Sequence, residues 1–137
     1  MSNKPSVLKE GKFNRLWESR RIRGRTGRVA YKDAAIRVTE QEVSFEGKPI
    51  RTETPLETVI DFRGILRLVL ETYEGRDGKP LYMILVNRFV FWTGDKTWFN
   101  VIDEKVRTLG NLRRREVIEY RPTRYTIPRI IQSTRSP

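Results

Sequence analysis

Short apolar segments of alternating polarity, separated by turns rich in glycine and proline, restrict the fold of this chain more than any other feature. Between Val29 and Phe45, apolar and polar residues alternate in short stretches, which is the period of strands with one buried face. Residues 46–49 and 74–80 combine glycine, proline and charged side chains and mark turns. The longest aliphatic run, at 83–86, is far too short to cross a membrane. The pattern therefore predicts short strands joined as antiparallel hairpins.

Two hairpins are predicted in the middle of the chain. The turn at 74–80 joins the apolar segments on either side of it. Residues 93–96 read Thr-Gly-Asp-Lys, with glycine at the position that a type II′ turn requires. Closing a second hairpin there pairs Trp92 with Thr97 and continues a strand through Phe99.

Two helices are predicted from the spacing of apolar residues. Phe13, Leu16 and Trp17 fall at i, i+3 and i+4, which favours a short amphipathic helix near the N-terminus. A second helix is predicted over 101–109, because Asn100 can accept hydrogen bonds from the first-turn amides and a glycine follows the last apolar position.

A single domain accounts for the chain, because 137 residues lie within the usual size range of one domain. We predict an α+β fold: an antiparallel β-sheet or partial barrel of about five to seven strands with the short N-terminal helix, the helix near 101–109 and extended basic ends. The predicted boundaries are a disordered basic tail at 1–11, a single α+β domain at 12–125 that includes a basic arm at 20–28, and an extended C-terminal tail at 126–137.

Three stretches resemble the opening strands of pleckstrin-homology-like domains. They are Ile-Arg-Val-Thr at 36–39, Val-Ser-Phe at 43–45 and Pro-Leu-Glu-Thr-Val-Ile at 55–60. The resemblance implies several antiparallel strands followed by a helix, which agrees with the predicted helix near the C-terminus. The basic phosphoinositide-binding motif expected between the first strands of that family is missing.

Cysteine and histidine are both absent, which excludes disulfides, Cys/His zinc sites, cysteine nucleophiles and histidine-dependent triads. No glycine motif of nucleotide-binding proteins is present, so no cofactor and no metal are predicted. We therefore expect a non-enzymatic protein. A small Mg²⁺-dependent nuclease is an alternative, because Glu46 and Lys48 form an acidic-x-Lys pattern with Asp33 upstream.

The net charge of +11 is concentrated in the two flanks of the chain. Residues 1–32 hold ten basic and two acidic side chains, residues 33–104 hold nine and thirteen, and residues 105–137 hold nine and two. Charge segregated in this way predicts a polyanionic partner. Arginine outnumbers lysine 20 to 8, which favours a thermophilic source.

Two arginine clusters are the predicted binding residues, because arginine forms bidentate hydrogen bonds with phosphate and carboxylate. Aromatic side chains near them are predicted to stack on bases or to dock on a partner. The arginines are Arg20, Arg21, Arg23, Arg25 and Arg28 in the first cluster and Arg113, Arg114, Arg115, Arg121 and Arg124 in the second, and the aromatic residues are Trp17, Tyr120 and Tyr125.

These features predict a cytoplasmic regulatory protein that docks on a nucleic-acid machine, foremost a transcription complex containing RNA polymerase. The arginine flanks would bind an acidic protein surface of that machine, and the β-rich core would provide shape-specific docking. A small, basic, cysteine-free chain of this kind is similar to the bacteriophage proteins that bind a host RNA polymerase. Direct DNA or RNA binding through phosphate contacts is the first alternative, and the nuclease is the second.

Overall fold

The computed structural model describes residues 6–51 and 54–119. Eight strands, one 3-10 turn and one α-helix follow each other along this part of the chain. Their bounds are β1 Val7–Ile22, β2 Arg25–Thr39, β3 Glu42–Pro49, β4 Leu56–Asp61, η1 Phe62–Gly64, β5 Arg67–Glu74, β6 Pro80–Val86, β7 Phe89–Thr93, α1 Thr97–Leu109 and β8 Arg114–Glu119.

All eight strands belong to one open sheet with the order β4-β3-β2-β1-β7-β6-β5-β8. Neighbouring strands are antiparallel except β5 and β8, which are parallel. Strands make up 63% of the described residues, and α1 is the one α-helix among them. The predicted α+β fold with five to seven strands and two helices is therefore wrong. The order implied by the pleckstrin-homology-like resemblance is present, since seven antiparallel strands precede α1.

The predicted N-terminal helix is instead part of β1. Phe13, Leu16 and Trp17 pair with residues of β2 in an antiparallel ladder that runs almost the full length of both strands. Leu16 is completely buried, and Phe13 packs on the aromatic core. Spacing at i, i+3 and i+4 is compatible with a helix but does not require one. The conformation of these residues is determined by their long-range pairing with β2. Because β1 begins at Val7, the predicted disordered tail at 1–11 is also wrong from that residue onward.

The predicted hairpin at 93–96 is replaced by the start of α1. Asp95 accepts hydrogen bonds from the backbone amide of Thr97 at 3.0 Å and from its hydroxyl at 2.6 Å, so its carboxylate takes the capping role predicted for Asn100. A hydrogen bond from Lys9 and those from Thr97 lower the pKa of Asp95 to about 2. The helix therefore begins at Thr97, four residues before the predicted start, and ends at Leu109 as predicted, with Gly110 as its cap.

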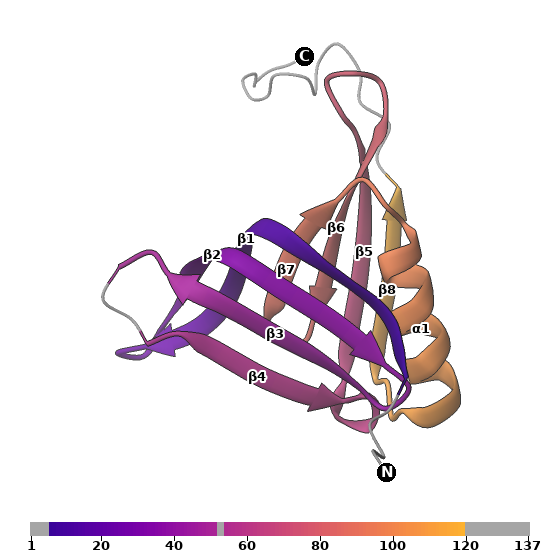
Figure 1. Ribbon diagram of the computed structural model, residues 1–137, viewed down its shortest axis with the longest axis horizontal. Helices are drawn as coiled ribbons and strands as arrows, with labels where there is room; N and C mark the ends of the chain where they lie inside the picture. Colours follow the sequence, from indigo (N-terminus) through magenta and orange to yellow (C-terminus); the bar gives the residue numbers. More distant parts are fainter. Residues whose placement is uncertain (1–5, 52–53, 120–137) are drawn as a thin grey trace.

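The core lies inside the curve of the sheet, where its two halves and α1 meet (Figure 1). Phe45 of β3 stacks on Phe89 of β7 with ring centroids 4.6 Å apart. Trp98 of α1 packs edge-on against Phe13 at 5.2 Å and Phe91 at 6.0 Å. The predicted turn at 74–80 does join two strands, because Tyr73 of β5 pairs with Leu81 of β6. Among the described residues, no helix has the length and apolar character needed to cross a lipid bilayer.

Candidate nucleic-acid interface

The end of the β1–β2 hairpin extends beyond the strands on either side of it. Pairing with β7 stops at Glu18, apart from a hydrogen bond of 2.8 Å from the Ser19 amide to the Arg88 carbonyl. Pairing of β2 with β3 stops at Tyr31. Residues 19–28 therefore form a two-stranded ribbon, which we call the arginine ribbon. Figure 1 shows it at the opposite end of the molecule from α1.

The arginine ribbon contains the whole first arginine cluster and no acidic residue. Arg21, Arg23, Arg25 and Arg28 are exposed and form no ion pair with any residue in 6–51 or 54–119. The predicted basic arm at 20–28 thus forms a paired hairpin. Its regular pairing fixes the spacing of the guanidinium groups, which an unstructured arm would have to order on binding.

The turn at the tip of the ribbon has an unfavourable residue at its first position. Arg23 and Gly24 have φ values of 52° and 79°, as in the type I′ turn that suits a two-residue hairpin. Asparagine or glycine normally occupies the first position, because a longer L side chain in the left-handed region costs about 1–2 kcal/mol. A strained conformation kept at an exposed tip points to a function for the Arg23 side chain.

Replacing Arg23 by asparagine is expected to stabilise the fold and weaken binding. Asparagine tolerates the left-handed conformation, so the free energy of unfolding should rise by about 0.5–1 kcal/mol. The lost guanidinium should lower affinity for nucleic acid at the same time. Urea unfolding and a binding titration on the same preparation measure both effects. Lower stability in the Arg23→Asn variant would contradict the assigned strain.

A buried carboxylate anchors the base of the ribbon. Glu18 is 4% exposed and accepts hydrogen bonds from Arg88 at 2.7 Å, Tyr31 at 2.9 Å and Arg20 at 3.1 Å. Arg20 also donates to the Tyr31 hydroxyl at 2.8 Å. The network joins β1, β2 and the β6–β7 turn where the ribbon leaves the sheet. It also assigns Arg20 to the structure rather than to a partner.

The environment of Glu18 favours its ionised form. Burial raises the pKa of this carboxyl, but the hydrogen bonds from Arg88 and Tyr31 and the charge of Arg20 outweigh burial and lower the pKa below its ordinary value. Glu18 therefore carries a full negative charge at neutral pH. That charge compensates part of the positive potential at the base of the ribbon.

Two of the three described arginines of the second cluster form ion pairs within the protein. Arg115 forms two hydrogen bonds with Asp103 of α1, at 2.8 and 3.0 Å, and these raise the pKa of Arg115. Arg114 lies 3.2 Å from Glu116. Arg113 is exposed and forms no ion pair with the described residues. The remaining members of the predicted set, Arg121, Arg124, Tyr120 and Tyr125, lie outside the described residues.

Trp17 is the predicted aromatic residue that the structure places beside the ribbon. It pairs with Ala30 of β2 and Val90 of β7, and its side chain is half-buried. Leu16 and Glu18 point into the core, so Trp17 lies on the outer face of the sheet. It is therefore separated from the core aromatic cluster and faces the surface from which the ribbon projects.

Sequence reasoning missed Glu18 and Arg88 as parts of this site. Glu18 could have been noticed, because it is the one acidic residue between Glu10 and Asp33 in a strongly basic segment. Arg88 gives no such signal. Its contact with Glu18 spans 70 residues of sequence and depends on the pairing of β1 with β7.

The residues of the nuclease alternative lie on the outer face of β2 and β3. Lys48 is 3.8 Å from Asp33, and both side chains are largely exposed. Glu46 lines a shallow hollow of about 280 Å³ together with Glu10 and Arg37. No group of three or more acidic side chains that could hold a metal ion occurs among the described residues. The structure thus brings Asp33 and Lys48 together, and the nuclease remains a sequence-based hypothesis.

No protein-family model, no curated protein and no solved structure matches this chain. Its function is therefore inferred from the chemistry of its own side chains.

Proposed function

We propose that this chain is a non-enzymatic protein that binds nucleic acid through the arginine ribbon. The observation that carries the proposal is the set of four exposed arginines on the ribbon that have no acidic partner among the described residues: Arg21, Arg23, Arg25 and Arg28. Clustered unpaired guanidinium groups repel each other in the free protein. Bound phosphate groups would neutralise that repulsion and accept bidentate hydrogen bonds from the guanidinium groups.

The form of the ribbon favours nucleic acid over an acidic protein surface. Protein interfaces have an apolar, desolvated centre in which charged residues are depleted. Apart from Ile22, the residues between the arginines of the ribbon are serine, threonine and glycine, which suits a hydrated phosphate backbone. A transcription complex as the wider setting and a cytoplasmic location remain sequence-based predictions within this proposal.

The salt dependence of binding tests the proposal. If the four arginines each neutralise one phosphate, the slope of log K against log salt should be about −2.8 to −3.6. Affinity should then fall about 50- to 150-fold between roughly 50 and 200 mM salt. Fluorescence anisotropy with a labelled oligonucleotide of about 16 nucleotides measures this slope. No binding at low salt, or a slope shallower than about −1, would reject the proposal. Binding instead to an acidic protein surface would support the docking on a transcription complex that the sequence predicts first.

A further inference from the structure

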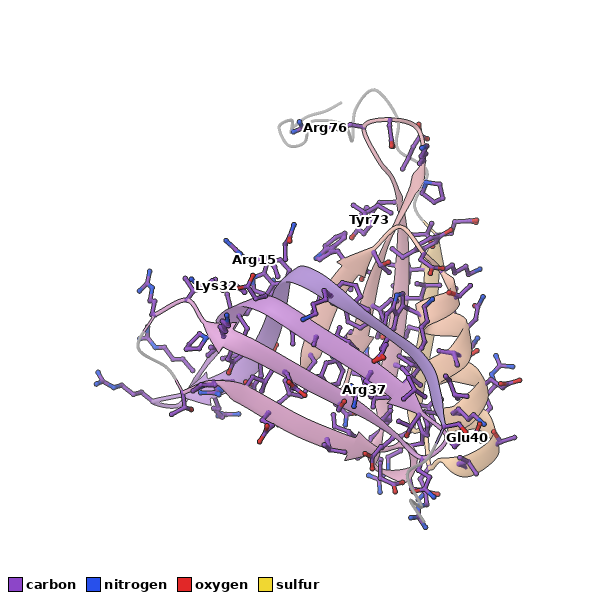
Figure 2. The ribbon with its side chains drawn as sticks, in the orientation of Figure 1. Arg15, Lys32, Arg37, Glu40, Tyr73 and Arg76 are labelled. Atoms are coloured by element: carbon purple, nitrogen blue, oxygen red, sulfur yellow. The ribbon has the colours of Figure 1, made fainter. Side chains whose placement is uncertain are left out.

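Three cationic side chains stand in register across three adjacent strands. Lys32 of β2 pairs directly with Arg15 of β1 on one side and with Lys48 of β3 on the other. All three are exposed, and Figure 2 shows Arg15 and Lys32 close together on the outside of the sheet. We call these three residues the cationic row.

The cationic row is unfavourable for the protein alone. Like charges directly opposite each other on neighbouring strands destabilise a sheet, and this arrangement occurs twice around Lys32. One acidic side chain, Asp33, approaches the row among the described residues, at 3.8 Å from Lys48. Within the described part of the chain, Arg15 donates only to the backbone carbonyl of Asn14, at 3.1 Å. A polyanion on this face would remove the repulsion.

The cationic row shares one face of the hairpin with two arginines of the ribbon, Arg21 and Arg28. Side chains two residues apart on a strand point to the same side, so Arg15, Trp17 and Arg21 share the outer face of β1. Lys32 pairs with Arg15, and Arg28 pairs with Ser19, so Lys32 and Arg28 lie on the same face of β2. Arg25 is three residues from Arg28 and lies on the opposite face. From Arg15 to the tip at Arg23 the strand advances eight residues, or about 26 Å. Trp17 lies within this track, between the cationic row and the ribbon.

We propose that a single-stranded segment of nucleic acid runs along this outer face. Its phosphates contact the cationic row and the arginine ribbon, and one base stacks on Trp17. The inference rests on the proposed function and names its substrate class. In a duplex the base faces are stacked inside the helix, so Trp17 could not stack on a base of bound duplex DNA or RNA. A single strand offers base faces and phosphates together.

Substitutions at Trp17 separate base stacking from charge. Trp17→Leu keeps an apolar side chain without an aromatic ring and should weaken binding of a single-stranded oligothymidylate about five- to hundredfold. Trp17→Phe keeps a ring and should restore most of the affinity. Polyphosphate has charge but no bases, so Trp17→Leu and Trp17→Phe should bind it with equal affinity. Trp92→Leu is the matched control, because Trp92 is exposed on β7, which carries none of the cationic residues of the track, and contacts Tyr73.

Lys32→Gln tests the cationic row independently. It should weaken binding of both the oligonucleotide and polyphosphate about fivefold at roughly 0.1 M salt, the contribution of one phosphate contact. It should also raise the thermal midpoint, because two like-charge pairs disappear. Lys79→Gln in the exposed β5–β6 turn is the control and should change neither quantity.

The outcomes distinguish this inference from the proposed function. Weaker binding in both Trp17→Leu and Lys32→Gln supports the track. If both variants bind with wild-type affinity while Arg23→Glu loses affinity, the proposed track is wrong and the ribbon remains the binding site. Tighter binding of a duplex than of its separate strands would also overturn it. Wild-type affinity in Arg23→Glu would reject the proposed function itself.

Discussion

Replacing Arg21, Arg23 and Arg28 together by glutamate is expected to lower affinity for nucleic acid about 100- to 500-fold at roughly 0.1 M salt. Each phosphate contact contributes about 0.7–0.9 decades of binding at this ionic strength. The salt slope should become shallower by about 2 to 3. The fold should survive, because these side chains are exposed and form no ion pair with the described residues. Anisotropy titrations and far-UV circular dichroism measure the two properties.

A pair of single variants controls for net charge. Arg23→Glu and Arg76→Glu change the charge of the chain equally, and both residues lie in exposed turns. Figure 2 shows Arg76 in the β5–β6 turn, which projects from a different side of the molecule. Arg23→Glu should weaken binding about five- to tenfold, and Arg76→Glu should leave it within about twofold. Equal losses in the two variants would mean that overall charge, and not the ribbon, governs binding.

Glu18→Gln is expected to cause the largest loss of stability among the single substitutions considered. The amide keeps the shape of the carboxylate but loses its charge, which three side chains contact. Hydrogen bonds to a buried charge are stronger than neutral ones, so the free energy of unfolding should fall by about 1–3 kcal/mol. Urea unfolding at neutral pH gives this value.

The difference in stability between the wild type and Glu18→Gln should decrease as the pH falls. The pKa of Glu18 in the folded protein is below its ordinary value of 4.5. A lowered pKa contributes stability above the ordinary value, and this contribution is lost as pH falls towards the folded-state pKa. The gap between wild type and Glu18→Gln should therefore be full at pH 7 and shrink below about pH 4.5.

The control for Glu18→Gln is Glu10→Gln on the same strand. Glu10 lies 3.4 Å from Arg37, and both side chains are more than half exposed. An exposed pair of this kind contributes little, so the change should stay within about 0.5 kcal/mol. Equal losses of unfolding free energy in Glu18→Gln and Glu10→Gln would contradict the role given to the buried network. A difference between wild type and Glu18→Gln that is independent of pH would contradict it as well.

The sequence singled out the arginines that we propose to bind nucleic acid, but their structure differs from the prediction. The arginines at 20–28 stood out because no acidic residue interrupts them, but Gly24 suggested a loop. In the folded chain that glycine forms a turn with Arg23, and both have positive φ. The length of β1 and β2 comes from their mutual pairing, which local propensity does not report.

The other differences also arise from contacts distant in sequence. Trp98 and Phe99 read as strand residues after a turn, and the Asp95 side chain instead starts a helix that buries both rings. The cationic row could not be predicted, because Arg15, Lys32 and Lys48 are separated by 17 and 16 positions. Only the register of β1, β2 and β3 aligns them.

Mapping the bound oligonucleotide by ¹H–¹⁵N NMR tests the central claim most directly. Titration of the wild-type chain with a single-stranded oligonucleotide should shift the backbone amides of the arginine ribbon most. Smaller shifts are expected around Arg15, Lys32 and Lys48, and none on the exposed side of α1. The largest shifts on α1 and β8, with an unaffected ribbon, would contradict the account and move the interface to the other end of the molecule.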